Sequence, residues 1–245
     1  MVRVGIICAD YVEVEPFFSF IQNCKVSQKA MLKFYEGAIN NVDIVALFCG
    51  VCKTNAAIAA QIIIDFYNVD FIINSGTAGG MNESLDIFDI VVATEVAYHD
   101  VHKDILIEFH PFMQSIYFQS DTTLLHLSRI VARRLESKSR IYFGRMVTGE
   151  KFITKDSRHE INSIFQPLSV DMETASIAHV CYVNQIPFIA IRCITDTAEN
   201  SGKVNFVKNC GIASEKSKDM VLELLVEINS CLYIQSQQGH IPDSN

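Results

Sequence analysis

The sequence lacks the features that define several large classes of protein. It has no apolar run near the ~20 residues that a membrane-spanning helix requires. Its 20 Lys and Arg are outnumbered by 28 Asp and Glu, which gives a formal net charge of -8. A chain of this charge offers no basic surface to phosphate groups, so we expect neither a nucleic acid nor a membrane surface as partner.

Proline and glycine are also sparse. With five prolines and 11 glycines in 245 residues, no Pro/Gly/Ser-rich linker divides the chain. We therefore expect a single domain over residues 1–234 and a polar C-terminal tail over residues 235–245. The first apolar run is short, and Asp10 and Glu13 follow it at once. A secretory signal has a different pattern, so we expect a cytoplasmic protein.

Tryptophan is absent, which bears on a close pair of cysteines. Cys49 and Cys52 follow an apolar run and precede a helical pattern, where a thioredoxin-like motif would lie. No Trp stands beside Cys49, however, and no second cysteine pair completes a zinc site. We interpret the eight cysteines as reduced thiols, with Cys49 and Cys52 as small residues where the backbone passes close to a ligand. A redox protein remains the alternative.

Apolar runs alternate with amphipathic segments along the whole chain. This alternation predicts an α/β protein with three α/β/α layers and a central mixed, mostly parallel sheet. Asn40-Asn41 tolerates the positive φ of a tight turn and predicts an antiparallel hairpin. Strands are expected at residues 2–9, 32–39, 42–48, 69–74, 87–96, 141–147 and 188–194, and helices at residues 12–23, 53–67, 121–137, 172–184 and 214–233.

Three carboxylates at the ends of predicted strands are the strongest indication of function. Glu13, Glu173 and Asp196 each follow an apolar run, so a parallel sheet would bring them to one edge, where such sheets bind ligands. With the glycine-rich turn at residues 74–80 (NSGTAGG), they indicate a site that cleaves a glycosidic bond. Each also has a structural interpretation. Glu13 completes a capping box with Asp10, Glu173 places a negative charge in the first turn of a helix, where the helix dipole stabilises it, and Asp196 caps a turn.

Several short segments stand in a distinctive order and spacing along the chain. They are Gly5-Ile6-Ile7 with Glu13 eight residues after the glycine, NSGTAGG at 74–80, YHD at 98–100, VDME at 170–173, AHVC at 178–181, Thr195-Asp196, and Phe206. In these segments the chain resembles bacterial 5'-methylthioadenosine/S-adenosylhomocysteine nucleosidases, of the purine nucleoside phosphorylase superfamily, and the resemblance covers roughly residues 1–230.

The resemblance implies a nucleoside-phosphorylase-like fold and a division of labour among the carboxylates. An N-glycosidic bond breaks through an oxocarbenium-like ribosyl cation, which requires an acid at the leaving group and a base on water. Asp196 matches the family's acid, which protonates adenine N7, and Glu13 matches the base. Glu173 matches the carboxylate that accepts hydrogen bonds from the ribose hydroxyls.

The resemblance also implies the remaining substrate contacts. Met172 is expected against the ribose, Phe152 and Ile153 at the adenine, and Val51 and Phe206 near the 5'-substituent. Thr77, Ala78 and Gly79 let the backbone approach the sugar. Asp10, Glu13 and Glu15 make the neighbouring loop acidic, with Arg3 as the nearest expected cation, so we expect water rather than phosphate as the nucleophile.

The chain departs from the family at several points. Cys52 replaces a glycine in Gly-x-Gly-Lys, and Asp171 replaces a glutamate. The usual Met-Glu-Glu is residues 10–12 (DYV), and residues 101–112 replace an apolar segment that closes the 5'-pocket from a neighbouring subunit. Ile105 and Phe109 are candidates for that wall. His99, Asp100, His102 and Asp104 suggest a metal site, but the family chemistry needs neither metal nor cofactor.

We therefore expect hydrolysis of 5'-methylthioadenosine, S-adenosylhomocysteine and 5'-deoxyadenosine to adenine and a 5'-substituted ribose. The alternatives are a futalosine-type nucleosidase, which has a different 5'-group, and a non-catalytic nucleoside-binding protein. The resemblance also implies a homodimer. The apolar residues at 62–64, Val51 and 105–112 support this expectation, because they are more than a single loop-rich rim would be expected to leave exposed.

Overall fold

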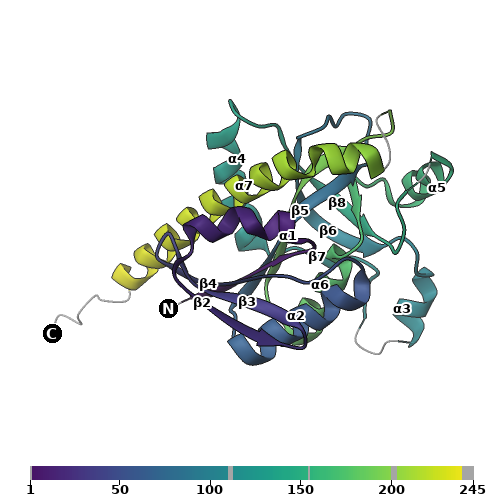
Figure 1. Cartoon of the computed structure of the whole chain (residues 1–245). Coiled ribbons are helices and arrows are strands. Elements are labelled where there is room, and N and C mark those ends of the chain that lie inside the picture. The colour runs from purple at the N-terminus through teal and green to yellow at the C-terminus, as the bar shows by residue number, and fades with distance from the viewer. Residues whose placement is uncertain (1, 110–112, 154, 200–202, 239–245) are drawn as a thin grey trace.

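The structure, a computed structural model, describes residues 2–109, 113–153, 155–199 and 203–238 (Figure 1). No helix in these ranges combines the length and apolar character needed to cross a membrane. The strands are β1 (Arg3–Cys8), β2 (Gln22–Lys29), β3 (Leu32–Ile39), β4 (Val42–Phe48), β5 (Phe71–Gly80), β6 (Ile90–Tyr98), β7 (Phe118–Gln119), β8 (Ile141–Thr148), β9 (Ser169–Asp171) and β10 (Phe188–Asp196). The helices are α1 (Tyr11–Val14), the 3-10 helix η1 (Glu15–Phe20), α2 (Lys53–Tyr67), α3 (Lys103–Phe109), α4 (Thr122–Leu135), α5 (Lys155–Phe165), α6 (Thr174–Asn184) and α7 (Lys203–Gln238).

The predicted fold class is confirmed, because helices cover both faces of a mixed sheet. Figure 1 shows α1 and α7 on one side of the strands and α2 and α6 on the other. Side chains alternate along β1, so Val4, Ile6 and Cys8 join the core beneath α1, α4 and α7. Ile7 points the opposite way, into the core beneath α2 and α6. Two apolar cores thus hold the sheet between the helices.

The sheet partly closes on itself, which the sequence did not indicate. Strand order is β10-β6-β8-β9-β5-β1-β4-β3-β2, and β10 also pairs with β5. β1, β4, β5 and β10 run parallel, whereas β6 and β9 run antiparallel to β10 and β5 respectively. The five strands β5, β9, β8, β6 and β10 therefore form a closed ring of pairings.

The expected hairpin between β3 and β4 is confirmed. Ile39 pairs with Val42 in antiparallel register, and Asn40 and Asn41 between them have φ of 50° and 62°. Asparagine adopts this left-handed conformation more easily than most residues. The turn residues alone were sufficient to fix this pairing.

The helix predicted over residues 12–23 is wrong. α1 ends at Val14, and the chain continues as the 3-10 helix η1, with Pro16 in its first turn. Pro16 has no N–H to donate, so a regular α-helix cannot continue through it. Residues 22–29 then form β2, an edge strand that is almost entirely exposed and so shows no apolar alternation.

Other element boundaries also differ from those predicted. Residues 74–80 form no turn but the second half of β5, because they pair with β10 on one side and β9 on the other. α7 begins at Lys203 rather than at 214 and continues to Gln238, into the segment expected as a polar tail. The rest of that segment, residues 239–245, lies outside the described residues. α3, α5, β7 and β9 were not anticipated.

Candidate active site

A cavity of about 220 Å³ lies where β1, β5, β9 and β10 end. Its lining includes all the residues expected to act in catalysis or to contact the substrate, apart from the two candidates in residues 101–112: Glu13, Val51, Thr77, Ala78, Gly79, Phe152, Ile153, Met172, Glu173, Asp196 and Phe206. The other lining residues are Ala9, Asp10, Lys151, Arg158, Val170, Asp171 and Thr195.

Glu13 is a buried carboxylate held by donors on both oxygens. Its Oε2 accepts from the backbone N–H of Ala9 at 2.8 Å and of Asp10 at 3.3 Å. Its Oε1 accepts from the N–H of Thr77 at 2.8 Å and from Thr77 Oγ1 at 2.7 Å. The capping box with Asp10 is therefore present, and the same carboxylate also faces the cavity. Glu13 therefore completes a helix cap and faces the cavity at the same time.

Gly76 makes this arrangement possible by having no side chain. A Cβ at this position would lie 2.6 Å from both Glu13 Oε2 and Arg192 Nη1. No side chain atom fits at that distance, so β5 can pass behind Glu13 only with glycine here.

Arg192 lies among the carboxylates of this site but was not predicted from the sequence. It is completely buried in β10, with Nε 3.1 Å from Asp171 Oδ2, Nη2 3.5 Å from Glu173 Oε2 and Nη1 4.0 Å from Glu13 Oε1. It therefore corrects the expectation that Arg3 is the nearest cation to the acidic residues. A charge inside an apolar strand must be paired, so the isolated arginine in FIAIRCITD was a signal that could have been read.

Asp171 and its neighbours hold this arginine in place. Arg192 Nη2 donates to Asn74 Oδ1 at 2.8 Å, and Asp171 Oδ1 accepts from Thr148 Oγ1 at 2.6 Å. The N–H groups of Glu173 and Thr174 also donate to Asp171 Oδ1. Asp171, which stands where the family pattern has glutamate, therefore still provides a carboxylate that accepts hydrogen bonds from the backbone between β9 and α6.

Glu173 is buried, and its Oε1 accepts the N–H of Cys52 at 2.9 Å. Burial raises its pKa to about 7; Arg192 and the Cys52 N–H oppose this shift, while Asp171 and Glu13 add to it. Glu173 therefore ionises less readily than an ordinary glutamate, although a cation lies beside it.

Asp196 is the last residue of β10 and is half-buried at the cavity wall. Thr195 Oγ1 donates to its Oδ1 at 2.9 Å. Gly79 of β5 is its partner in register, and a Cβ on Gly79 would lie 3.4 Å from Asp196 Oδ2. Arg158, a buried cavity-lining arginine of α5, interacts electrostatically with Asp196.

The three carboxylates meet, but not for the reason predicted. Glu13 and Asp196 follow parallel strands, whereas β9, which precedes Glu173, runs antiparallel to β5. β9 has only three residues and pairs with the last two residues of β5. Glu173 thus reaches the cavity because β9 is short and crosses the end of β5.

The mouth of the cavity carries aromatic residues. Phe152 and Phe206 meet edge to face, with ring centroids 5.9 Å apart, and Phe152 is half exposed. Ile105 and Phe109 of α3 are exposed and do not line the cavity, so the wall expected from them is not formed within one chain. Residues 110–112 of the same segment lie outside the described residues.

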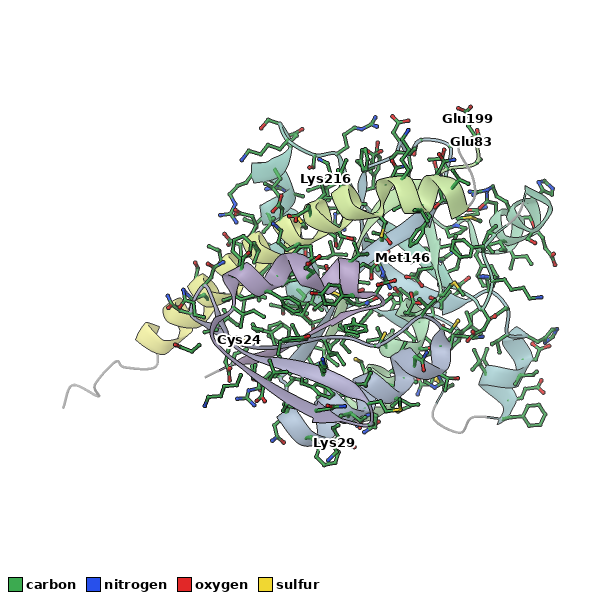
Figure 2. The ribbon with its side chains drawn as sticks, viewed as in Figure 1. Cys24, Lys29, Glu83, Met146, Glu199 and Lys216 are labelled. Carbon is green, nitrogen blue, oxygen red and sulfur yellow. The ribbon has the colours of Figure 1, made fainter. Side chains whose placement is uncertain are left out.

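The cysteine pair does not have the properties of a redox centre. Burial raises the pKa of Cys49, and burial together with Glu150 raises the pKa of Cys52 to about 11. A reactive cysteine needs a lowered pKa. Among the other cysteines, Cys24 is exposed and lies on the edge strand β2, outside the core (Figure 2).

Within the described residues, no three or more His, Cys, Asp and Glu side chains form a group that could hold a metal ion. Asp100 instead pairs with Lys53, and His102 pairs with Asp104.

Comparisons with known proteins show the family to which the chain belongs. A family model described as the phosphorylase superfamily matches residues 3–226. The 5'-methylthioadenosine/S-adenosylhomocysteine nucleosidase of Buchnera aphidicola subsp. Schizaphis graminum is 34% identical over 233 residues, which are 93% of this chain and 98% of that protein. The nucleosidase of the same name from Listeria monocytogenes is 34% identical over 235 residues, or 92% and 99% of the two chains.

Solved structures give the same result. The 5'-methylthioadenosine/S-adenosylhomocysteine nucleosidase from Neisseria meningitidis, in complex with methylthio-immucillin-A, has a TM-score of 0.85 at 29% identity and covers 92% of this chain and 99% of its own. The chain therefore belongs to the phosphorylase superfamily and, within it, to the family of 5'-methylthioadenosine/S-adenosylhomocysteine nucleosidases.

Proposed function

We propose that this chain hydrolyses the N-glycosidic bond of 5'-methylthioadenosine and S-adenosylhomocysteine, and of 5'-deoxyadenosine, to release adenine. The observation that carries the proposal is the convergence of Glu13, Glu173 and Asp196 on one cavity, in a chain whose relatives bear the name of this activity. The Neisseria relative binds methylthio-immucillin-A, which supports a nucleoside ligand of this kind.

In the proposed reaction the bond between ribose C1' and adenine N9 breaks, and its electron pair moves into the purine ring. Asp196 delivers a proton to N7, so adenine leaves as a neutral base. Water adds to C1' while Glu13 accepts a water proton, and the sugar product is a free 5'-substituted ribose. The donors from Ala9, Asp10 and Thr77 fix the Glu13 carboxylate, so it needs little reorganisation in this step.

The remaining lining residues bind the substrate. Glu173 accepts hydrogen bonds from the ribose hydroxyls, and Met172 packs against the ribose. Phe152 stacks on adenine, and the Ile153 backbone reads its edge. Thr77, Ala78 and Gly79 pass close to the sugar, and Val51 and Phe206 face the 5'-group. No cofactor takes part.

Water is favoured over phosphate by the charge of the cavity. Asp10, Glu13, Asp171, Glu173 and Asp196 line it, against Lys151 and Arg158 as the cations among the described lining residues. Arg192 lies behind the carboxylates and is occupied by Asp171 and Asn74. A phosphate dianion would therefore meet mainly like charge.

A futalosine-type nucleosidase is the second candidate, because it would use the same groups with another 5'-substituent. The futalosine hydrolase of Helicobacter pylori has a TM-score of 0.84 but is only 24% identical, so it shares the fold alone. Comparing kcat/KM for methylthioadenosine, S-adenosylhomocysteine and aminodeoxyfutalosine separates the two. We expect methylthioadenosine to be at least as good as the others, and a preference above tenfold, about 1.4 kcal/mol, for the futalosine-type substrate would overturn this assignment.

A homodimer and a cytoplasmic location belong to the same proposal. Of the apolar residues first expected at an interface, Ile63 is completely buried in the core. Ile58 and Phe66 of α2, Tyr182 and Val183 of α6, and Ile105, Ile107 and Phe109 of α3 are exposed. α2 and α6 pack against one another, so their exposed residues form a surface that a second copy would cover.

A further inference from the structure

The YHD segment at residues 98–100 is part of the family resemblance, but none of its side chains lines the cavity. Its contacts with other segments suggest what it contributes. Asp100 binds Lys53 through both oxygens, with Nζ at 2.8 and 2.9 Å, and its Oδ2 accepts the backbone N–H of Glu150 at 3.0 Å. Glu150 Oε1 in turn accepts the backbone N–H of Lys53 at 3.0 Å. We call these three residues, Lys53, Asp100 and Glu150, the Asp100 clasp.

The clasp joins the two segments that would hold opposite ends of a nucleoside. On one side Lys53 begins α2, directly after Cys52, whose N–H fixes Glu173 Oε1. On the other side Glu150 lies two residues before Phe152 in the segment that forms one cavity wall. A change at Asp100 is therefore transmitted to both walls, although Asp100 touches neither.

His99 contacts the segment that leads to Glu150. Its backbone N–H donates to Thr148 O at 3.0 Å, and a Cβ on Gly149 would lie 2.1 Å from the ring Nε2 of His99. Only glycine fits there, so the backbone at Gly149 rests directly on the imidazole. Burial lowers the pKa of His99, so the ring is favoured in its neutral form.

A simpler interpretation is that Lys53 and Asp100 form an ordinary surface ion pair, and such pairs contribute little to stability. Two observations argue against it. Asp100 accepts from Lys53 Nζ and from the backbone N–H of Glu150, and Glu150 accepts from the backbone N–H of Lys53. The three residues therefore form a closed ring of hydrogen bonds rather than a single ion pair. Burial alone would raise the pKa of Asp100, yet the Lys53 and Glu150 hydrogen bonds hold that pKa below its usual value, so the carboxylate is ionised and fully engaged.

We propose that Asp100 is a positioning residue for nucleoside binding, because it fixes the distance between the wall that carries Glu173 and the wall that carries Phe152 and Ile153. This inference depends on the proposed function for its substrate, adenine-containing nucleosides. The clasp residues do not line the cavity that Glu13 and Asp196 face, so we expect the clasp to affect binding of substrate and transition state alike. It therefore sets KM rather than kcat.

The test uses Asp100→Asn, with Asp43→Asn as a matched control. Asp43 pairs with Arg3 at 2.6 Å, at the start of β4, and its side chain is 27% exposed, as is that of Asp100. We expect Asp100→Asn to raise KM for methylthioadenosine and the Kd for adenine, measured by calorimetry, about tenfold. We expect kcat to change by less than about threefold, and the control to leave all three constants near wild type.

Lys53→Met provides a second variant, checked for folding by circular dichroism, in case Asp100→Asn does not fold. It should raise the adenine Kd less than Asp100→Asn, and the double variant should be no worse than Asp100→Asn alone, because the residues act as one unit. Unchanged adenine affinity in Asp100→Asn, or an equal loss in Asp43→Asn, would overturn the proposal. If wild type binds adenine but releases none from nucleosides, the proposed function fails while the adenine Kd values still decide the clasp; if wild type binds no adenine, both fail.

Discussion

At the residue scale, Glu13 shows how one carboxylate serves the fold and the site together. It caps α1, accepts from Thr77 of β5 and faces the cavity, so removing it would affect stability and chemistry at once. Asp196 is the last residue of β10 and lies half-buried at the cavity wall, so its substitution tests the proposed chemistry directly.

We predict that Asp196→Asn lowers kcat for adenine release ~10²–10⁴-fold, because an amide cannot supply the proton that N7 requires. Thermal unfolding and adenine binding should change little, since Asn keeps the shape of the side chain. The assay is adenine release followed by HPLC under saturating methylthioadenosine. Wild-type turnover in the folded variant would contradict the role assigned to Asp196.

Glu173 gives a pH-dependent prediction. Burial raises its folded-state pKa to about 7 from an ordinary value of 4.5, so the folded protein binds this proton more tightly than the unfolded chain. Its contribution to stability is complete below pH 4.5 and is lost as the pH rises to about 7. Glu173→Gln has no proton to lose, so its stability relative to wild type should increase from pH 5 to pH 8, by on the order of 1–3 kcal/mol.

Urea unfolding of both proteins at the two pH values measures this difference directly. A stability difference that does not vary with pH would show that Glu173 ionises normally in the folded protein.

At the element scale, the start of α2 contains backbone strain. Cys52 has φ 86° and ψ 160°, a conformation that is almost confined to glycine. The conformation aims the Cys52 N–H at Glu173, so the site requires it whatever the side chain.

We predict that Cys52→Gly stabilises the protein by about 1 kcal/mol, because relief of strain outweighs the added freedom of glycine in the unfolded chain. Cys52→Ala is the matched control: it removes the same thiol but keeps the Cβ, and should not be stabilising. Thermal unfolding compares the three proteins. Equal melting temperatures for the Gly and Ala variants would refute the strain.

The elements with local signals could be predicted from the sequence. The Asn40-Asn41 turn predicted its hairpin, and nearly continuous apolar runs predicted β1, β4 and β10. β2 and β9 could not be predicted, because β2 is an exposed polar edge and β9 is a three-residue bridge that depends on partners distant in sequence. Glu13, Glu173 and Asp196 were nominated from their positions after apolar runs, and the other cavity residues through the family resemblance. Arg192 required the recognition that a charge in an apolar strand must be paired.

At the scale of the whole molecule, one chain leaves apolar surface uncovered on α2, α3 and α6. We predict that sedimentation at micromolar concentration gives twice the chain mass of 27.5 kDa. Phe66→Glu, on the exposed face of α2, should weaken the dimer because a charge would be buried at the interface, whereas the exposed Met31→Glu on the β2–β3 turn should not. A fully active wild-type monomer would exclude the dimer.

Because the cavity is acidic, the proposed nucleophile is water rather than phosphate. The identity of the sugar product tests this proposal most directly. Dialysed protein, given 5'-methylthioadenosine without phosphate, should release adenine and a free reducing 5'-methylthioribose at a rate that added phosphate does not increase. Release that requires phosphate and yields a pentose 1-phosphate would contradict the assignment of this chain as a hydrolase.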